Sequence, residues 1–349
     1  MNTFLKGINK APDITYRWLR VNDTTIKKEH FPAVKNAVDV KITGEKFLNI
    51  EEMKKSEYLY SSAPMGTEYR AYVEKNRKKQ TTYTITETPD IPIRLEYFLQ
   101  EETIIESEKL VIEEGVQATI MYIYKGCGTQ FQVREVLVKK GARCKLFKVN
   151  LLANNSLAVT EVIVKAEEGA AVEVIHVNMG EEIAVDNINL NLDKKAVGNI
   201  TGLYLSGNED EIDMNYTTVF HDKESAGSIE ARGALLDKAK KVFRGTIDFR
   251  KGASGAAGSE SEEVILLSDE VKNVAVPIIL CGEDDVKGEH AASCGRIDED
   301  KLFYLMSRGL SMEESKKMIV EGAFYPILDK IPDEELVKEI SSIIQRRLA

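Results

Sequence analysis

Short runs of alternating apolar and polar residues dominate the chain from Thr81 onward. Runs such as TTYTIT, TIMYIY, FQVREVLV, AVEVIHVN and NINLNL are rich in β-branched and aromatic residues. Helical spacing is almost absent across roughly 200 residues. Because a period of two places successive side chains on opposite faces of a strand, the pattern predicts a large β structure in the centre of the protein.

A glycine recurs between these predicted strands at regular intervals. Gly115, Gly141 and Gly169 each follow a strand and a few polar residues and precede the next strand, and they lie 26 and 28 residues apart. Glycine suits such a corner because it adopts positive φ without steric cost. Self-similarity with a period of about 20 to 50 residues is typical of stacked repeats that share a core. The pattern favours a parallel β-helix, with an antiparallel sandwich or barrel as the structural alternative.

The first 84 residues have a different pattern. They contain Trp18, the only tryptophan, and mixed-charge stretches such as FLNIEEMKKSEYLY that favour helix over strand. The segment EYRAYVEKNRKKQ, at 68–80, predicts a helix with a basic face, which is either solvated or forms a lid. We therefore expect a mainly helical extension over 1–84 and a β-helix core over 85–296.

Helix signals return in residues 297–349, which we expect to form a C-terminal helical region. Asp298 is placed to cap a helix through KLFYLMSR, and Ser311 with Glu314 makes a capping-box pattern for a second helix. A third helix is predicted after Asp333, with an apolar stripe formed by Leu336, Val337, Ile340, Ile343 and Ile344. These apolar faces pack either against the end of the solenoid or against a second protein.

The net charge and the number of cysteines exclude some classes of protein. The chain has 47 Lys and Arg against 57 Asp and Glu, a net charge of −10, so nucleic acid is not an expected partner. No run approaches the ~18 apolar residues of a membrane span, and the first residues lack an apolar signal core. We therefore expect no membrane association and a cytoplasmic location.

The four scattered cysteines indicate reduced thiols, and Cys127 and Cys144 fall in or beside predicted strands, where buried thiols are common.

Familiar catalytic motifs are missing from the sequence. It contains no G-x-x-x-x-G-K-[ST], H-E-x-x-H, G-x-S-x-G or C-x-x-C pattern. The glycine-rich stretch RKGASGAAGSESEE, at 250–263, lacks the lysine of a nucleotide loop, so it is interpreted as a turn between strands. We expect a chain that binds no nucleotide directly and is not itself an enzyme.

The segment CGEDDVKGEHAASCGRID, at 281–298, concentrates potential metal ligands. His290 lies within ten residues of Cys281 and Cys294 and beside several carboxylates. Thiolate, imidazole and carboxylate together suit zinc or iron, and thiolate suits iron–sulfur species in particular. The segment is therefore either a metal or cluster site at His290 or a loop packed at a domain junction. His176, in an apolar strand, and His221, at a strand end, are interpreted as structural.

Two longer stretches resemble the SufB/SufD family of iron–sulfur cluster assembly proteins. They are FRGTIDFRKGASGAAGSESEEVILLSDE, at 243–270, and the segment 274–311, with its phrases D-D-V-K-x-x-H-x-A-x-x-G-x-I-D and L-F-Y-L-x-S-R-G. The resemblance implies a right-handed parallel β-helix flanked by N-terminal and C-terminal helical regions. It also implies a non-catalytic scaffold subunit that pairs with a SufB-like subunit, or with itself, and with a SufC-like ABC ATPase.

The resemblance also implies roles for single residues. His290 matches the family's histidine near the subunit interface, which makes it, with Cys281 and Cys294 nearby, the candidate ligand of iron or of a transient iron–sulfur cluster. Glu262 stands where the SufB type has a cysteine, and Ala291 where it has a glutamate, so the chain is most like a SufD-type subunit. The family's ATPase-docking helices match the segments 302–309 and 311–324, which gives the docking candidates Leu302, Phe303, Leu305, Met306, Arg308 and Gly309.

One alternative belongs to a different class of protein. A β-helix enzyme acting on polysaccharide would use paired carboxylates, such as Asp284 with Asp285 or Glu262 with Glu263, as acid and base. Adjacent residues on a strand point to opposite faces, so either pair is poorly placed to act on one glycosidic bond. A third possibility is an assembly scaffold with no metal role.

Overall fold

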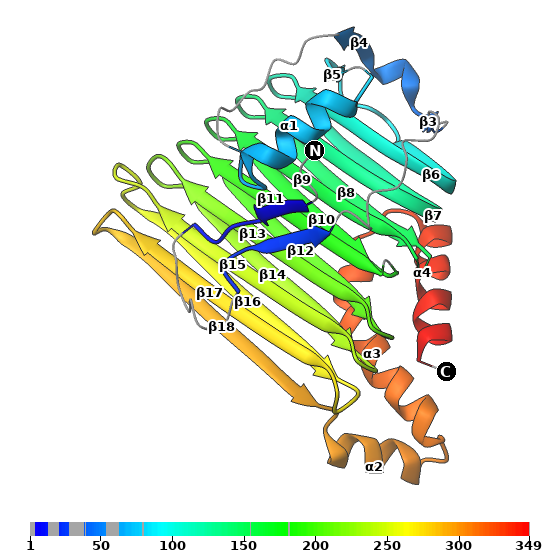
Figure 1. The fold of residues 1–349 in the computed structure, drawn as a ribbon. Helices are drawn as coiled ribbons and strands as arrows, with labels where there is room; N and C mark the ends of the chain where they lie inside the picture. The colour runs from blue at the N-terminus through cyan, green and yellow to red at the C-terminus, as the bar shows by residue number, and fades with distance from the viewer. Residues whose placement is uncertain are drawn as a thin grey trace.

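The chain folds around a parallel β-solenoid. The computed structural model describes residues 4–12, 21–27, 38, 40–53, 63–78, 80–153, 155–180 and 182–348, and Trp18 and His30 lie outside these ranges. Within them a 16-stranded sheet winds through about eight turns, as Figure 1 shows. The predicted parallel β-helix is therefore confirmed, and the antiparallel alternative is wrong because the strands between residues 80 and 296 pair with one another in parallel.

The elements follow one another in a simple order. The N-terminal part contains β1 (Phe4–Ile8), β2 (Thr24–Lys27), β3 (Val40–Thr43), the 3₁₀ helix η3 (Glu45–Phe47), β4 (Asn49–Met53) and α1 (Thr67–Asn76). The solenoid contains β5 (Gln80–Ile85), β6 (Ile93–Ile112), β7 (Gln117–Val138), β8 (Arg143–Leu152), β9 (Leu157–Ala166), β10 (Ala171–Asn178), β11 (Ile183–Leu192), β12 (Val197–Ser206), β13 (Glu211–Phe220), β14 (Ala226–Leu235), β15 (Lys240–Phe249), β16 (Ala256–Leu266), β17 (Lys272–Cys281) and β18 (Val286–Arg296). The C-terminal helices are α2 (Glu299–Ser307), α3 (Met312–Leu328) and α4 (Glu334–Arg347).

The solenoid has two faces that meet at the long strand β7. The first part of β7 pairs with β8 and its second part pairs with β9. From there the even-numbered strands stack in one direction as far as β18, and the odd-numbered strands as far as β17. Inward side chains of the two faces form one continuous core, which includes Ile188, Tyr216 and Phe243. Residues that are 26 to 31 positions apart in the sequence thus lie side by side.

The predicted glycine corners lie on one edge of the solenoid. Gly115, Gly141 and Gly169 have φ values of 72°, 66° and 68°. Each donates its backbone N–H to the carbonyl of the residue before the next corner, at 2.9 to 3.2 Å. Lys195 and Glu224 continue the series with φ values of 57° and 58°. Positive φ therefore recurs at this corner from Gly115 to Gly255, as the glycine spacing predicted.

The C-terminal helices α3 and α4 cover the outer face of the even-numbered strands. Phe324 of α3 and Leu336, Ile340 and Ile344 of α4 pack on Phe147 and on neighbouring side chains of that face. The predicted stripe of the third helix therefore packs against the solenoid, although against its side and not its end. The predicted caps are confirmed, because Asp298 accepts backbone N–H groups at the start of α2 and the capping box of α3 is formed.

The expected mainly helical extension is corrected for the N-terminal residues that the structure describes. The stretch starting FLNIEEM forms no α-helix at its start, since Phe47 ends the 3₁₀ helix η3 and residues 49–53 form β4, which pairs antiparallel with β5. Helix α1 forms as predicted, and its basic residues divide between packed and solvated positions. Arg70 is buried and bonds Glu161 at 3.0 Å, and Arg77, directly after the helix, pairs with Glu74 at 2.8 Å. Lys75 and Lys78 are exposed. The predicted solvated face is therefore confirmed for the two lysines and wrong for Arg70.

A polar clasp fixes the N-terminal arm, residues 4–12 and 21–27, to the outer face of the odd-numbered strands. Asp213 of β13 accepts hydrogen bonds of 2.6 Å from the Asn9 amide and from the Thr24 hydroxyl. Arg244 forms an ion pair with the same carboxylate at 2.5 Å and donates to the backbone carbonyl of Val21. The arm is therefore held by buried charge as well as by apolar packing. Among the described residues, no helix has the length and apolar composition that a bilayer span requires.

Candidate site at the open end of the solenoid

Strands β17 and β18 end the two faces of the solenoid. β17 pairs with β15 and β18 with β16, and in the described part of the chain no further strand covers either of them. Almost every residue of β18 is exposed. The interpretation of 281–298 as a loop packed at a junction is therefore wrong, because most of the segment is an open edge strand.

His290 and Cys294 share the inward side of β18. His290 lies beside Glu260 of β16 in the strand register, and Cys294 lies beside Val264, which is a buried core residue. Since side chains alternate along a strand, residues at even positions of β18 extend the interior columns of the solenoid. The two side chains are exposed because no turn covers them. They are four positions apart along the strand, a distance of roughly 13 Å, so they do not bind one metal ion together.

Cys281 lies on the other face. It is the last residue of β17 and is exposed, so the fold separates the three candidate ligands that the sequence places close together. Among the described residues, no group of three or more His, Cys, Asp and Glu is arranged to hold a metal ion. Imidazole and thiolate suit iron chemically, but the described residues alone supply an incomplete ligand set.

Glu262 is occupied by other partners inside the last turns. It is 3% exposed, it forms an ion pair with the Lys241 ammonium, and it accepts a 3.0 Å hydrogen bond from the Tyr204 hydroxyl. Burial lowers the pKa of Lys241, and the carboxylate of Glu262 acts in the opposite direction. At the position that the sequence resemblance aligns with the SufB-type cysteine, this chain therefore has a buried carboxylate whose Oε1 atom binds both Tyr204 and Lys241.

Glu260 is a site residue that the sequence analysis missed. It lies on the inward side of β16 and is 3% exposed, and its Oε2 atom has no hydrogen-bond partner within the described residues. Burial, and then the charge of Glu262, raises the pKa of this carboxyl to about 7. The available signal was the alternation in AAGSESEEVIL, where Glu260 and Glu262 share a face with Gly258 and Val264.

The paired carboxylates of the enzyme alternative do not face a common substrate position. Glu262 points inward and is buried, whereas its neighbour Glu263 is exposed on the outer side. Asp284 and Asp285 lie in the turn before β18, where Asp285 accepts a hydrogen bond of 2.9 Å from Ser254. This geometry gives no support to an acid and base on opposite sides of one bond.

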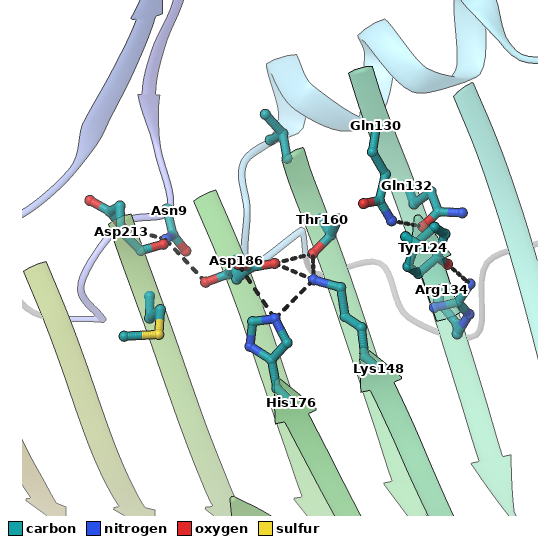
Figure 2. Close-up of polar contacts among 12 residues, drawn as sticks. Asn9, Tyr124, Gln130, Gln132, Arg134, Lys148, Thr160, His176, Asp186 and Asp213 are labelled. Atoms are coloured by element: carbon teal, nitrogen blue, oxygen red, sulfur yellow. Dashed lines mark hydrogen bonds and ion pairs between the residues drawn. The ribbon is translucent and has the colours of Figure 1, made fainter. Parts of the chain in front are cut away.

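A second group of polar side chains lies deeper in the solenoid, as Figure 2 shows. The Lys148 ammonium contacts the hydroxyl of Thr160 at 2.6 Å and Nε2 of His176 at 3.3 Å, and it forms an ion pair with Asp186. His176 also contacts the hydroxyl of Tyr216 at 2.7 Å. Burial, reinforced by the Lys148 charge, lowers the pKa of His176 to about 3. His176 is therefore a neutral core residue, as the sequence predicted.

The structure also places the other residues that the sequence analysis considered, namely His221, two cysteines and the glycine-rich stretch. His221 follows β13 and contacts the amide oxygen of Asn191 at 2.9 Å, which agrees with a structural role. Cys144 is buried, and burial raises the pKa of its thiol to about 12, so the thiol stays protonated. Cys127 is half-buried in the middle of β7. Of the glycine-rich stretch 250–263, residues 250–255 form the turn between β15 and β16, as predicted, whereas residues 256–263 belong to β16 itself.

Helix α2 carries the predicted docking residues beyond the last strands (Figure 1). Leu302 and Leu305 are half-buried, whereas Phe303 is 75% exposed and Met306 is also exposed. Arg308 caps the helix, and Gly309 follows it with a φ of 99°. Only Ile297 and Asp298 separate α2 from β18. The helix thus presents an apolar surface that is joined almost directly to the strand carrying His290.

Comparison with known proteins identifies the family. The model for the SUF system FeS cluster assembly SufBD core domain matches residues 98–323. The iron-sulfur cluster assembly protein SufD of Bacillus subtilis (strain 168) is 35% identical over 173 residues, which are 49% of this chain and 39% of that protein. The SufB protein of the same organism is 25% identical over 276 residues, 76% of this chain and 57% of that protein. A SufBD family protein of Mycobacterium leprae is 24% identical over 267 residues, 74% of this chain and 31% of that protein.

The matched segments thus span less than two thirds of the relatives' own lengths. The family model, however, covers more than half of this chain and includes the solenoid strands from β7 to β18, the helix α2 and most of α3. The sequence resemblance at 243–311 lies entirely within the matched region. The chain belongs to the SufB/SufD family of SUF system iron–sulfur cluster assembly proteins.

Proposed function

We propose that this chain is a non-catalytic, SufD-like scaffold subunit of a SUF-type iron–sulfur cluster assembly complex. The observation that carries the proposal is the open end of the solenoid, where β18 presents His290 and Cys294 on an unpaired edge without a third ligand among the residues that the structure describes. An incomplete ligand set on an open strand edge is completed when another chain adds its own end to the sheet. The cluster is the cargo of this interface.

The partner in this proposal is a SufB-like subunit that supplies thiolate. Glu262 is held by Lys241 and Tyr204, so it is not free to bind the cluster. A second copy of this chain would therefore also lack a cluster ligand at residue 262. The two edges also differ, because β17 contains Pro277, which lacks a backbone donor, whereas β18 contains no proline. We therefore place the main strand pairing at β18.

The second proposed partner is a SufC-like ABC ATPase. The exposed Phe303 and Met306 of α2 form the docking surface, since large exposed apolar side chains mark protein interaction sites. The two-residue link between β18 and α2 gives a physical route by which ATP-driven movement of the ATPase displaces the strand that carries His290. This chain needs no nucleotide site of its own in that scheme.

The proposed location of the complex is the cytoplasm. The four cysteines of the chain are free thiols, and a reducing compartment keeps them available for iron chemistry.

Anaerobic co-purification tests the proposed function. The full chain is co-expressed with a SufB-like paralogue and a SufC-like ATPase, and the purified material receives ferrous iron and sulfide. We expect one complex containing all three proteins, with the visible absorption of an iron–sulfur cluster. A chain that purifies alone, together with a cluster band that forms equally well without it, would contradict the scaffold role.

A further inference from the structure

Glu260 combines burial with an unsatisfied charge-bearing atom. Its side chain is 3% exposed, and its Oε2 atom has no hydrogen-bond partner within the part of the chain that the structure describes. Withdrawing a carboxylate oxygen from water without a partner is costly, so such a group is neutralised by a proton or is paired with a water molecule or an ion. The Glu260 carboxyl is therefore either protonated or bound to a partner from outside the described residues.

The neighbouring side chains do not supply that partner. The Lys241 ammonium lies against Oε1 of Glu262, and the Tyr204 hydroxyl donates to the same oxygen at 3.0 Å. The fold nevertheless keeps space for the Glu260 carboxylate. A Cβ atom at Gly245, on the facing strand β15, would lie 2.6 Å from Cγ and 2.8 Å from Oε1 of Glu260. Glycine at this position is required by the close approach of that side chain.

The position relative to His290 indicates the class of ligand. Glu260 and His290 are paired across β16 and β18 and lie on the same inward side of the even-numbered face. Neighbouring strands are about 4.8 Å apart, a spacing that lets two side chains converge on one ion. Imidazole with carboxylate is a donor pair for divalent first-row metals, ferrous iron among them.

We propose that Glu260 is a ligand of ferrous iron and that it acts with His290 at the open end of the solenoid. The pair supplies two donors, and the remaining donors come from outside the described residues. This agrees with the finding that the described residues contain no group of three metal-binding side chains. In the assembly complex the partner subunit supplies such donors, and this part of the inference rests on the proposed function.

Metal titration of the isolated full chain tests the inference without any partner. Cobalt(II), added anaerobically, serves as a coloured probe for ferrous iron, and its visible absorption reports binding. We expect Glu260→Gln and His290→Ala each to weaken cobalt binding by about tenfold or more, as the loss of a ligand predicts. The matched controls are Glu263→Gln and Glu289→Gln, on the same two strands, and we expect them to change the affinity by less than about twofold.

Circular dichroism and thermal unfolding establish that each variant is folded, and Glu260→Asp retains the carboxylate if the glutamine variant fails to fold. Wild-type affinity in Glu260→Gln, with or without a loss in His290→Ala, would overturn the role of Glu260. Failure of this inference leaves complex formation with the paralogue and ATPase untouched. Failure of the scaffold proposal, in turn, does not alter cobalt binding by the isolated chain.

Discussion

The Tyr204 hydroxyl donates a 3.0 Å hydrogen bond to Glu262, which also pairs with the Lys241 ammonium inside the last turns of the solenoid. The three groups come from β12, β15 and β16, so they tie both faces together. Removing one member of a buried ion pair leaves the other charge uncompensated, whereas replacing both by apolar residues is often neutral.

We therefore expect Glu262→Ala to lower the free energy of unfolding by about 3 kcal/mol or more. The double variant Lys241→Met with Glu262→Leu should recover most of that loss. Urea denaturation followed by circular dichroism measures both. A Glu262→Ala midpoint equal to the wild-type value would show that the ion pair does not contribute to stability.

Buried neutral His176 predicts a specific pH dependence of stability. Burial holds its pKa at about 3, below the ordinary value of 6.5, so between these values the unfolded chain binds a proton that the folded chain does not. The stabilisation is complete above pH 6.5 and falls as the pH drops toward 3. At pH 5 the loss from this residue amounts to about 2 kcal/mol.

Urea denaturation at pH 7.5 and pH 5.0 checks the His176 prediction. We expect His176→Gln to show a difference between the two pH values that is smaller than the wild-type difference by about 2 kcal/mol. An unchanged difference would mean that His176 is protonated in the folded chain.

Removing the Asp213 carboxylate should release the N-terminal arm from the outer face of the odd-numbered strands. Asp213→Ala removes the acceptor shared by Asn9, Thr24 and the buried Arg244. We expect hydrogen exchange in residues 4–12 and 21–27 to accelerate by at least about tenfold, while the solenoid strands β7 to β12 keep their protection. The control is Glu211→Ala, because Glu211 lies on the same strand as Asp213 and its exposed carboxylate pairs with Lys240 of the neighbouring strand β15. Equal exchange in both variants would contradict a role for the clasp.

If α2 is the docking surface, a substitution on its exposed face should weaken ATPase binding without affecting the fold. Phe303 is 75% exposed, so Phe303→Asp should leave folding intact and weaken binding to the SufC-like ATPase by at least about tenfold. Phe98→Asp is the matched control, because Phe98 is an aromatic residue of β6 that is 61% exposed. Calorimetric titration measures the two affinities, and full-strength binding by Phe303→Asp would move the docking site elsewhere.

Local signals made most of the solenoid predictable from the sequence. The period of two, the positive-φ corners at Gly115, Gly141 and Gly169, and the cap at Asp298 each depend on a few adjacent residues. Interactions between distant segments were not predictable in this way. The acidic partner of Arg70 lies 91 residues away, and the strand β4 is fixed by its antiparallel pairing with β5.

The same limit applies to the candidate site. The sequence identified His290 and the cysteines by residue type, but it placed Cys281, Cys294 and His290 in one cluster that the two faces of the solenoid divide. Glu260 was missed because its proximity to His290 depends on a strand register of 30 residues, which no local pattern specifies.

The cluster content of the reconstituted complex tests the central claim most directly. The three-protein complex is prepared anaerobically with the wild-type chain, with His290→Ala and with Glu289→Ala as the control on the outer side of the same strand, and each receives equal iron and sulfide. We predict that all three assemble and that His290→Ala loses most of the cluster absorption while Glu289→Ala retains it. An intact His290→Ala complex with wild-type cluster absorption would contradict the account.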